Sequence, residues 1–121
     1  MLGYLYHLKM LKISINKRAF VNILNNKKKI EGRLSKGIFS KICIGDVFTF
    51  YNNNESCDVK IIKINCYNNF YDMLSNENLR NLLPYCNNIN EGLNLYNKIY
   101  KKNTDKYKVL AIHFNLLNPT T

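Results

Sequence analysis

The sequence contains no apolar run close to the roughly 20 residues that a membrane-spanning helix needs, so we expect no attachment to a membrane. Repeats and long linkers are also absent, and the 121 residues suffice for one hydrophobic core but not for two. Because 46% of the residues are hydrophobic, the chain should fold rather than stay disordered. We therefore predict a single domain over residues 1–121, acting as a monomer.

The sequence also lacks the ligand spacing of a zinc site. Its cysteines, Cys43, Cys57, Cys66 and Cys86, form no CxxC pair and have no histidine near them in sequence. We expect free, mostly buried thiols in a reducing compartment, with no metal and no cofactor. The first residues, MLGYLYHLKMLKISIN, lack a basic leader and a small-residue cleavage site. They predict a first strand in a protein that is cytoplasmic or nuclear, not secreted.

Acidic residues are scarce, because 8 Asp and Glu stand against 18 Lys and Arg, for a net charge of +10. A basic surface of this size attracts polyanions such as RNA, DNA or an acidic membrane face. The alternative is a general solubility charge, in a sequence whose many Lys, Asn and Ile residues reflect an AT-rich genome. Composition leaves both interpretations open.

Alternation of apolar and polar residues predicts strands at 11–15, 29–34, 47–51, 57–67 and 109–117. A turn at Gly45-Asp46 precedes the third of them, and an Asn-rich loop tip follows it. The apolar frame of the fourth shifts between Ile61 and Ile62, which indicates a bulge or a strand buried on both sides.

Helical spacing predicts three to four short helices, and we expect each to begin at a polar cap. The expected caps are Asn16, Asn69 or Asn68, Ser75, and Asn90 or Asn88. In the first helix we expect Phe20, Ile23 and Leu24 to face inward. Together these elements predict an α+β fold, a small barrel of five to six mostly antiparallel strands decorated by short helices.

The decapeptide NNKKKIEGRL, residues 25–34, carries the most specific charge pattern. If residues 29–34 are extended, Lys29, Glu31 and Arg33 share one face, and the apolar residues share the other. Such a trio can neutralise itself, or it can hold an anionic ligand while Glu31 orients Arg33. From spacing alone the first outcome, a surface pair of Glu31 with Arg33 or Lys29, is favoured.

The order of the elements resembles the ASCH domain, a branch of the PUA-like β-barrel superfold, over residues 10–117. The pieces that carry the resemblance are a first strand and short helix, the strand Asn26-Lys27-Lys28-Lys29-Ile30-Glu31-Gly32-Arg33, Gly45-Asp46 with its aromatic strand, Tyr67-Asn68-Asn69-Phe70-Tyr71-Asp72-Met73-Leu74, Leu83-Pro84, a helix with Tyr96 and Tyr100, and the strand Val109-Leu110-Ala111-Ile112.

The resemblance implies a cleft at the open side of the barrel, lined by the KxxExR strand. Carried over residue by residue, Lys28, Glu31 and Arg33 form the candidate ligand site, with Lys29 beside them. Asn26 replaces the usual glycine and also tolerates positive φ. Some family members are amidohydrolases acting on acetylated cytidine through a Lys and a Thr of this motif. Glu31 stands where that Thr is expected, so this activity is not transferred.

We therefore predict a module that binds RNA or another single-stranded nucleic acid and can hold a nucleoside. The open alternatives are a hydrolase of modified nucleosides or RNA, with Lys28 and Glu31 as its acid–base pair, and a protein-interaction module. Tyr67 or Tyr96, partly exposed, would stack on a base. His7 is expected near a mobile end and His113 to be a satisfied structural residue. The candidate phosphate contacts are Lys27, Lys36, Lys41, Lys98, Lys101 and Lys102.

Overall fold

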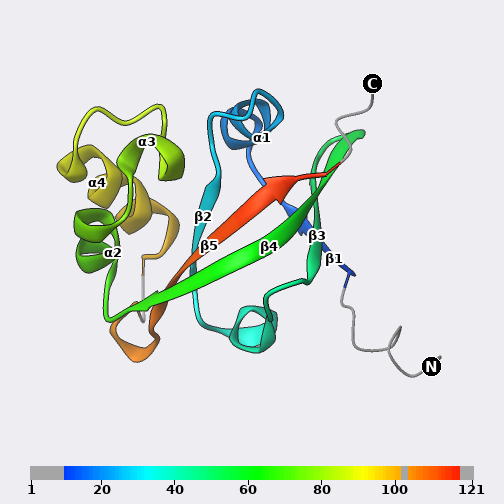
Figure 1. The fold of residues 1–121 in the computed structure, drawn as a ribbon. Helices are drawn as coiled ribbons and strands as arrows, with labels where there is room; N and C mark the ends of the chain where they lie inside the picture. Colours follow the sequence, from blue (N-terminus) through cyan, green and yellow to red (C-terminus); the bar gives the residue numbers. More distant parts are fainter. Residues whose placement is uncertain (1–9, 102–103, 118–121) are drawn as a thin grey trace.

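In the computed structural model, which describes residues 10–101 and 104–117, five strands form one sheet in the order β1-β3-β4-β5-β2 (Figure 1). The strands are β1 (Met10–Ser14), β2 (Ile30–Leu34), β3 (Val47–Asn52), β4 (Glu55–Tyr67) and β5 (Val109–Leu116). The helices are α1 (Lys17–Leu24), α2 (Phe70–Asn76), α3 (Leu79–Leu82) and α4 (Ile89–Ile99), with 3₁₀ turns η2 (Gly37–Lys41) and η3 (Thr104–Lys106).

The sheet is curled and mostly antiparallel, as predicted. Only β1 pairs in parallel, with β3, while β3–β4, β4–β5 and β5–β2 are antiparallel. The expected irregularity in β4 is a register shift between Ile61 and Lys63. β1 and β2 are the two edges of the sheet. The fold class is thus confirmed as a curled half-barrel of mixed α+β type.

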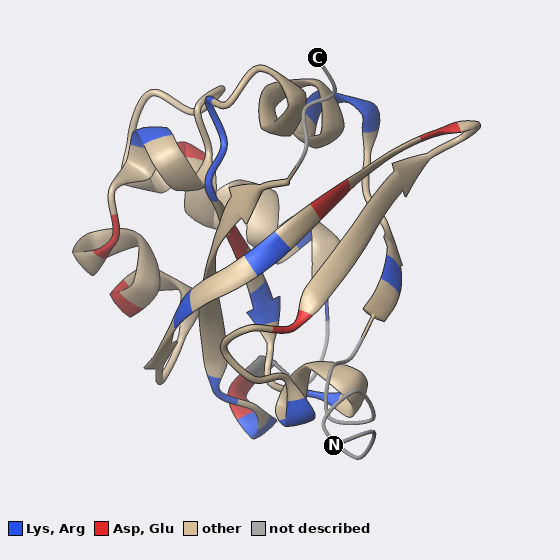
Figure 2. Ribbon diagram, turned by 45° about the vertical axis from the view of Figure 1, so that its right-hand side comes forward, with Lys and Arg blue, Asp and Glu red and all other residues tan. Residues whose placement is uncertain are grey.

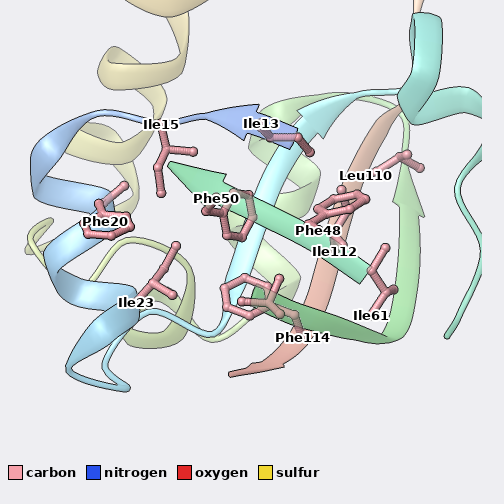
Figure 3. Close-up of a cluster of buried hydrophobic side chains, with 12 residues drawn as sticks. Ile13, Ile15, Phe20, Ile23, Phe48, Phe50, Ile61, Leu110, Ile112 and Phe114 are labelled. Carbon is pink, nitrogen blue, oxygen red and sulfur yellow. The ribbon is translucent and has the colours of Figure 1, made fainter. Parts of the chain in front are cut away.

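The two faces of the sheet bury two separate cores, because side chains alternate between the faces along each strand. The first core fills the inside of the curl, where α1 closes one end with Phe20 and Ile23 (Figure 3). Phe48 and Phe50 on β3 pack there edge to face, their ring centroids 5.9 Å apart. Ile112 on β5 joins them, fully buried.

The second core lies on the other face, where α2, α3 and α4 gather on one side of the sheet (Figure 1). Ile30 and Leu34 on β2 pack there beside Ala111 on β5. Tyr96 on α4 is stacked on Phe70 of α2, with ring centroids 4.4 Å apart and an interplanar angle of 12°. β2 therefore separates this core from the face that carries Glu31 and Arg33.

The helix caps follow the sequence except at one position. Asn16, Asn69 and Asn88 cap α1, α2 and α4, each side chain accepting a hydrogen bond from a backbone N–H of the first turn. Ser75 was the wrong choice, since α2 continues through it and Asn78 caps α3. The Ser75 hydroxyl donates to the Tyr71 carbonyl instead.

Two further expectations need correction. Leu24, expected to face inward, is 42% exposed because α1 ends there and the chain turns away at Asn26, whose φ is +59°. The four thiols are free as predicted, but none is fully buried. Cys43 in a surface loop and Cys66 on β4 are exposed, and Cys57 and Cys86 are half-buried. Within residues 10–101 and 104–117, no helix is long and apolar enough to cross a membrane.

Candidate functional site

Lys28 lies between α1 and β2 and is buried, with 2% of its surface exposed. Its Nζ donates to the carbonyls of Ile30 and Leu82, at 2.7 Å and 2.5 Å, and lies 3.2 Å from Glu31 Oε1. Each N–H donor of the ammonium therefore has an acceptor within the protein. Burial lowers the pKa of Lys28 against the opposing attraction of Glu31. The side chain ties α3 to β2 and fixes one oxygen of Glu31.

Glu31 joins the two cations of the motif. Its Oε2 accepts from Arg33 Nε at 2.8 Å, while Oε1 faces Lys28. Burial opposes ionisation of Glu31, but Lys28 and Arg33 together outweigh it and hold the pKa of this carboxyl below its ordinary value. Burial likewise disfavours the charged guanidinium, yet the attraction of Glu31 raises the pKa of Arg33. The shifts of Glu31 and Arg33 both favour the charged form of the pair.

The trio lines a cavity of about 280 Å³, which we call the seam cavity because residues of both sheet edges border it. Ser14 is the last residue of β1 and Ile15 follows it, while Glu31, Gly32 and Arg33 come from β2. The remaining wall consists of Asn16, Ala19, Lys28, Leu83, Tyr85, Leu95, Tyr96, Ile99 and Tyr100. An ion pair and a set of tyrosines thus line one hollow between β1 and β2, which lie at opposite ends of the sheet order.

A second hollow of about 490 Å³, the basic groove, adjoins the seam cavity. Arg33, Ile99 and Tyr100 line both hollows, whereas Lys36 and Lys101 line the basic groove but not the seam cavity. Phe39 and Ile38 of η2 supply its apolar floor. The Arg33 guanidinium carbon lies 4.9 Å from the centroid of the Phe39 ring. Arg33 therefore stands at the junction of the two hollows.

The structure brings only part of the predicted site together. Lys28, Glu31, Arg33 and Tyr96 line the seam cavity, but Tyr96 is 4% exposed and held by Phe70, so it is a wall rather than a partly exposed stacking platform. Lys29, which precedes β2, is exposed and lines neither hollow.

The other predicted contacts lie elsewhere. Lys27, Lys41 and Lys98 are exposed but line neither hollow, and Lys102 and His7 are outside the described residues. Lys and Arg are spread over several elements rather than gathered in one stripe (Figure 2). The distribution of charge alone therefore does not identify an interface. Lys36 and Lys101 are candidates for binding an anion because they line the same groove as Arg33.

Sequence analysis missed a polar cluster around Glu77, the residue that follows α2. Its side chain is 4% exposed, and its Oε1 lies 2.7 Å from His113 Nε2. Its Oε2 accepts hydrogen bonds from the Tyr67 hydroxyl and from Asn65 Nδ2. Tyr67 is thus not a cavity residue, and burial raises its pKa to about 12 with Glu77 adding to the shift. His113 is satisfied, as predicted.

Glu77 should make the stability of the protein sensitive to acid. Burial disfavours its charge, but hydrogen bonds from Tyr67 and Asn65 and the attraction of His113 lower the pKa of the carboxyl overall. A carboxyl with a lowered folded pKa stabilises the protein fully above its unfolded pKa of about 4.3, and that contribution is lost as pH falls through the folded value.

Urea unfolding between pH 3 and pH 7 measures this effect. Wild type should lose stability as the pH falls through the acid range, and Glu77→Gln should show a flatter profile from a lower starting value. Glu55→Gln is the matched control, because the Glu55 side chain is 61% exposed and its surface pair with Lys17 contributes little. Equal profiles for wild type and Glu77→Gln would contradict the assignment.

The chemistry open to the seam cavity follows from these contacts. Lys28 has no spare donor and both oxygens of Glu31 face cations, so the arrangement does not favour an acid–base pair. Arg33 uses Nε–H on Glu31, which leaves its terminal N–H groups for an anion or a base edge. Within the described part of the chain, no group of three His, Cys, Asp or Glu residues could hold a metal.

Comparison of the structure with solved structures identifies the class of fold. The ASCH protein of Zymomonas mobilis matches 88% of this chain and 67% of its own, at 14% identity and a TM-score of 0.62. At that identity the likeness concerns the fold, and the protein has the ASCH-domain fold, as its sequence predicted. No protein-family model and no curated protein matched the sequence.

Two further structures are related in sequence as well. Hypothetical protein PH0355 is 31% identical, with 89% of this chain and 99% of that chain covered and a TM-score of 0.82. Protein PF0455 from Pyrococcus furiosus, solved in solution, is 34% identical, with 89% and 97% covered and a TM-score of 0.74. The chain belongs to the family of these two proteins.

Proposed function

We propose that the protein binds single-stranded RNA, with one nucleotide in the seam cavity and neighbouring phosphates along the basic groove. The observation that carries the proposal is the place of Arg33, which lines both hollows. A guanidinium held by a carboxylate is ordered before a ligand arrives, so less conformational entropy is lost on binding.

The basic groove has the kinds of side chains that bind single-stranded nucleic acid. Lys36 and Lys101 are exposed and can neutralise phosphates, while exposed apolar side chains such as Ile38 and Ile99, at 50% and 53%, offer contact to sugars and bases. The net charge of +10 adds a long-range attraction for any polyanion. Both the position of these side chains in the groove and the net charge of the protein support RNA binding.

Fluorescence anisotropy with a short unstructured RNA tests the proposal. Each phosphate contact on a single strand contributes about 0.7 to the slope of log K against log salt. The variant Lys36→Gln/Lys101→Gln should therefore bind more weakly at low salt and show a slope smaller by about 1.4. Both side chains are exposed, so the variant should fold as wild type does.

The matched control is Lys60→Gln/Lys63→Gln, which removes the same charge from exposed positions on β4 that line neither hollow. Its salt slope should stay close to that of wild type. If the two double variants weaken RNA binding equally, the protein attracts RNA through its net charge, and the basic groove is not the binding site. If wild type binds no RNA at low salt, the proposal fails altogether.

A further inference from the structure

The proposed function requires Arg33, a long and rotatable side chain, to stay at the junction of the seam cavity and the basic groove. Glu31 holds one point of the guanidinium group, because Arg33 Nε donates to Glu31 Oε2 at 2.8 Å. Ordering a side chain with many rotamers costs conformational entropy, so each contact made before a ligand arrives makes binding more favourable. A second contact to the same group would therefore strengthen the site.

Phe39 of η2 provides that second contact. The Arg33 guanidinium carbon lies 4.9 Å from the centroid of the Phe39 ring, within the roughly 6 Å of a cation–π contact. The face of an aromatic ring attracts a cation electrostatically, and Phe39 is half-buried, so water screens this attraction only in part. Glu31 and Phe39 thus reach the guanidinium from two different elements, β2 and η2.

The Phe39 ring is itself fixed by the first core. It packs edge to face on Phe48, which is fully buried there (Figure 3), with ring centroids 6.1 Å apart and an interplanar angle of 79°. The backbone of η2 is anchored as well, since Phe39 N–H donates to the Lys36 carbonyl at 3.1 Å. Just after η2, Cys43 N–H donates to the buried Asp46 carboxylate at 2.8 Å. The ring can therefore hold Arg33 rather than follow it.

We infer that Phe39 is a positioning residue, which orients the Arg33 guanidinium at the junction of the two hollows and acts on RNA through Arg33. This inference rests on the proposed function and names the side chain that prepares its central cation. With Nε donating to Glu31 and the guanidinium carbon over the Phe39 ring, the two terminal nitrogens remain as a fork for a phosphate or a base edge. Loss of the ring should leave the charge of the site intact and its orientation weakened.

Phe39 also lines the basic groove, so the alternative role is a direct contact of its ring with a base. A direct contact would contribute whether or not Arg33 is present, whereas a positioning contact contributes only through Arg33. The guanidinium carbon already lies over the ring, which favours the positioning role. A double-mutant cycle between the two positions separates the two roles.

Fluorescence anisotropy with a short unstructured RNA measures the cycle. Phe39→Leu, which keeps an apolar contact with Phe48, should weaken binding about twofold to fivefold, the effect of a partly exposed cation–π contact, and leave the salt slope unchanged. In the Arg33→Gln background the same substitution should leave the affinity unchanged. Equal losses in both backgrounds would show a direct contact and overturn the inference. Tyr51→Leu is the matched control, because it removes a ring that is 38% exposed on β3 and lines neither hollow.

The Nε–H signal of Arg33 in a proton–nitrogen NMR spectrum tests the contact without RNA, and its loss in Arg33→Gln assigns it. Phe39→Leu should move this signal, because the ring current is gone, and should speed the exchange of the proton with water. Phe39→Tyr retains the ring and should restore both properties. An unchanged signal in Phe39→Leu would overturn the inference and leave RNA binding standing. If wild type binds no RNA, the proposed function fails, and the Arg33 signal still decides whether Phe39 orients the guanidinium.

Discussion

Replacing Lys28 by methionine is expected to lower the free energy of unfolding by about 3–5 kcal/mol. The substitution keeps the apolar stem but leaves the carbonyls of Ile30 and Leu82 without a donor in a buried place. It also removes one of the two cations that pair with Glu31 among the described residues; the Glu31 side chain is 12% exposed. Thermal unfolding should show a midpoint lower by about 10–20 °C.

The adjacent lysine provides the control. Lys29 is exposed, so Lys29→Met removes the same charge one position along the chain and should change the unfolding free energy by less than about 0.5 kcal/mol. A similar, small change in both variants would mean that Lys28 does not hold α3 to β2. In Lys28→Met/Glu31→Gln the buried carboxylate is removed too, so the combined loss should be smaller than the sum of the single losses.

Gly32→Ala is the second large effect that we expect, at about 1–3 kcal/mol of unfolding free energy. A Cβ on Gly32 would lie 2.5 Å from the Tyr96 hydroxyl oxygen and 2.8 Å from Met73 Cε. Met73 is flexible and can shift. Tyr96 cannot, because it is stacked on Phe70 and 4% exposed. Chemical denaturation with urea measures the loss.

The Tyr96→Phe background isolates the cause. Removing the hydroxyl relieves the shortest contact and leaves Tyr96 Cζ at 3.0 Å from the added Cβ. Gly32→Ala should therefore cost less in Tyr96→Phe than in wild type, with a coupling energy in the range of about 0.5–3 kcal/mol. An equal cost in both backgrounds would show that the close approach of Tyr96 to β2 does not require glycine.

The local structure could be predicted because its signals lie within a few residues of one another. The caps Asn16, Asn69 and Asn88 bond to N–H groups three residues later, and the alternation of Ile30 to Leu34 assigns each side chain to a face. Ser75 failed as a cap because two helices joined by a short turn offer several polar candidates, and tertiary packing chose Asn78.

The candidate site could be predicted only in part. Alternation placed Glu31 and Arg33 on one face, and their contact at 2.8 Å follows from that spacing. Alternation alone placed Lys29 on the other side of Glu31, whereas the resemblance implied Lys28. The structure supplies Lys28, which precedes β2 and reaches the Leu82 carbonyl. Glu77 and His113 are 36 residues apart, so no local pattern could pair them.

By itself the sequence determined most strands and helices and the charged motif, because hydrophobic period, capping and turn chemistry act over a few residues. The ASCH-type fold followed from the resemblance of the ordered elements to that family. Only the tertiary structure decided that Lys28 is buried and that Arg33 lines two hollows. Those properties depend on which strands lie at the edges of the sheet and on how α3 and α4 pack beside β2. Contacts of that kind join residues that are distant in sequence, and no periodic pattern of hydrophobic and polar residues predicts them.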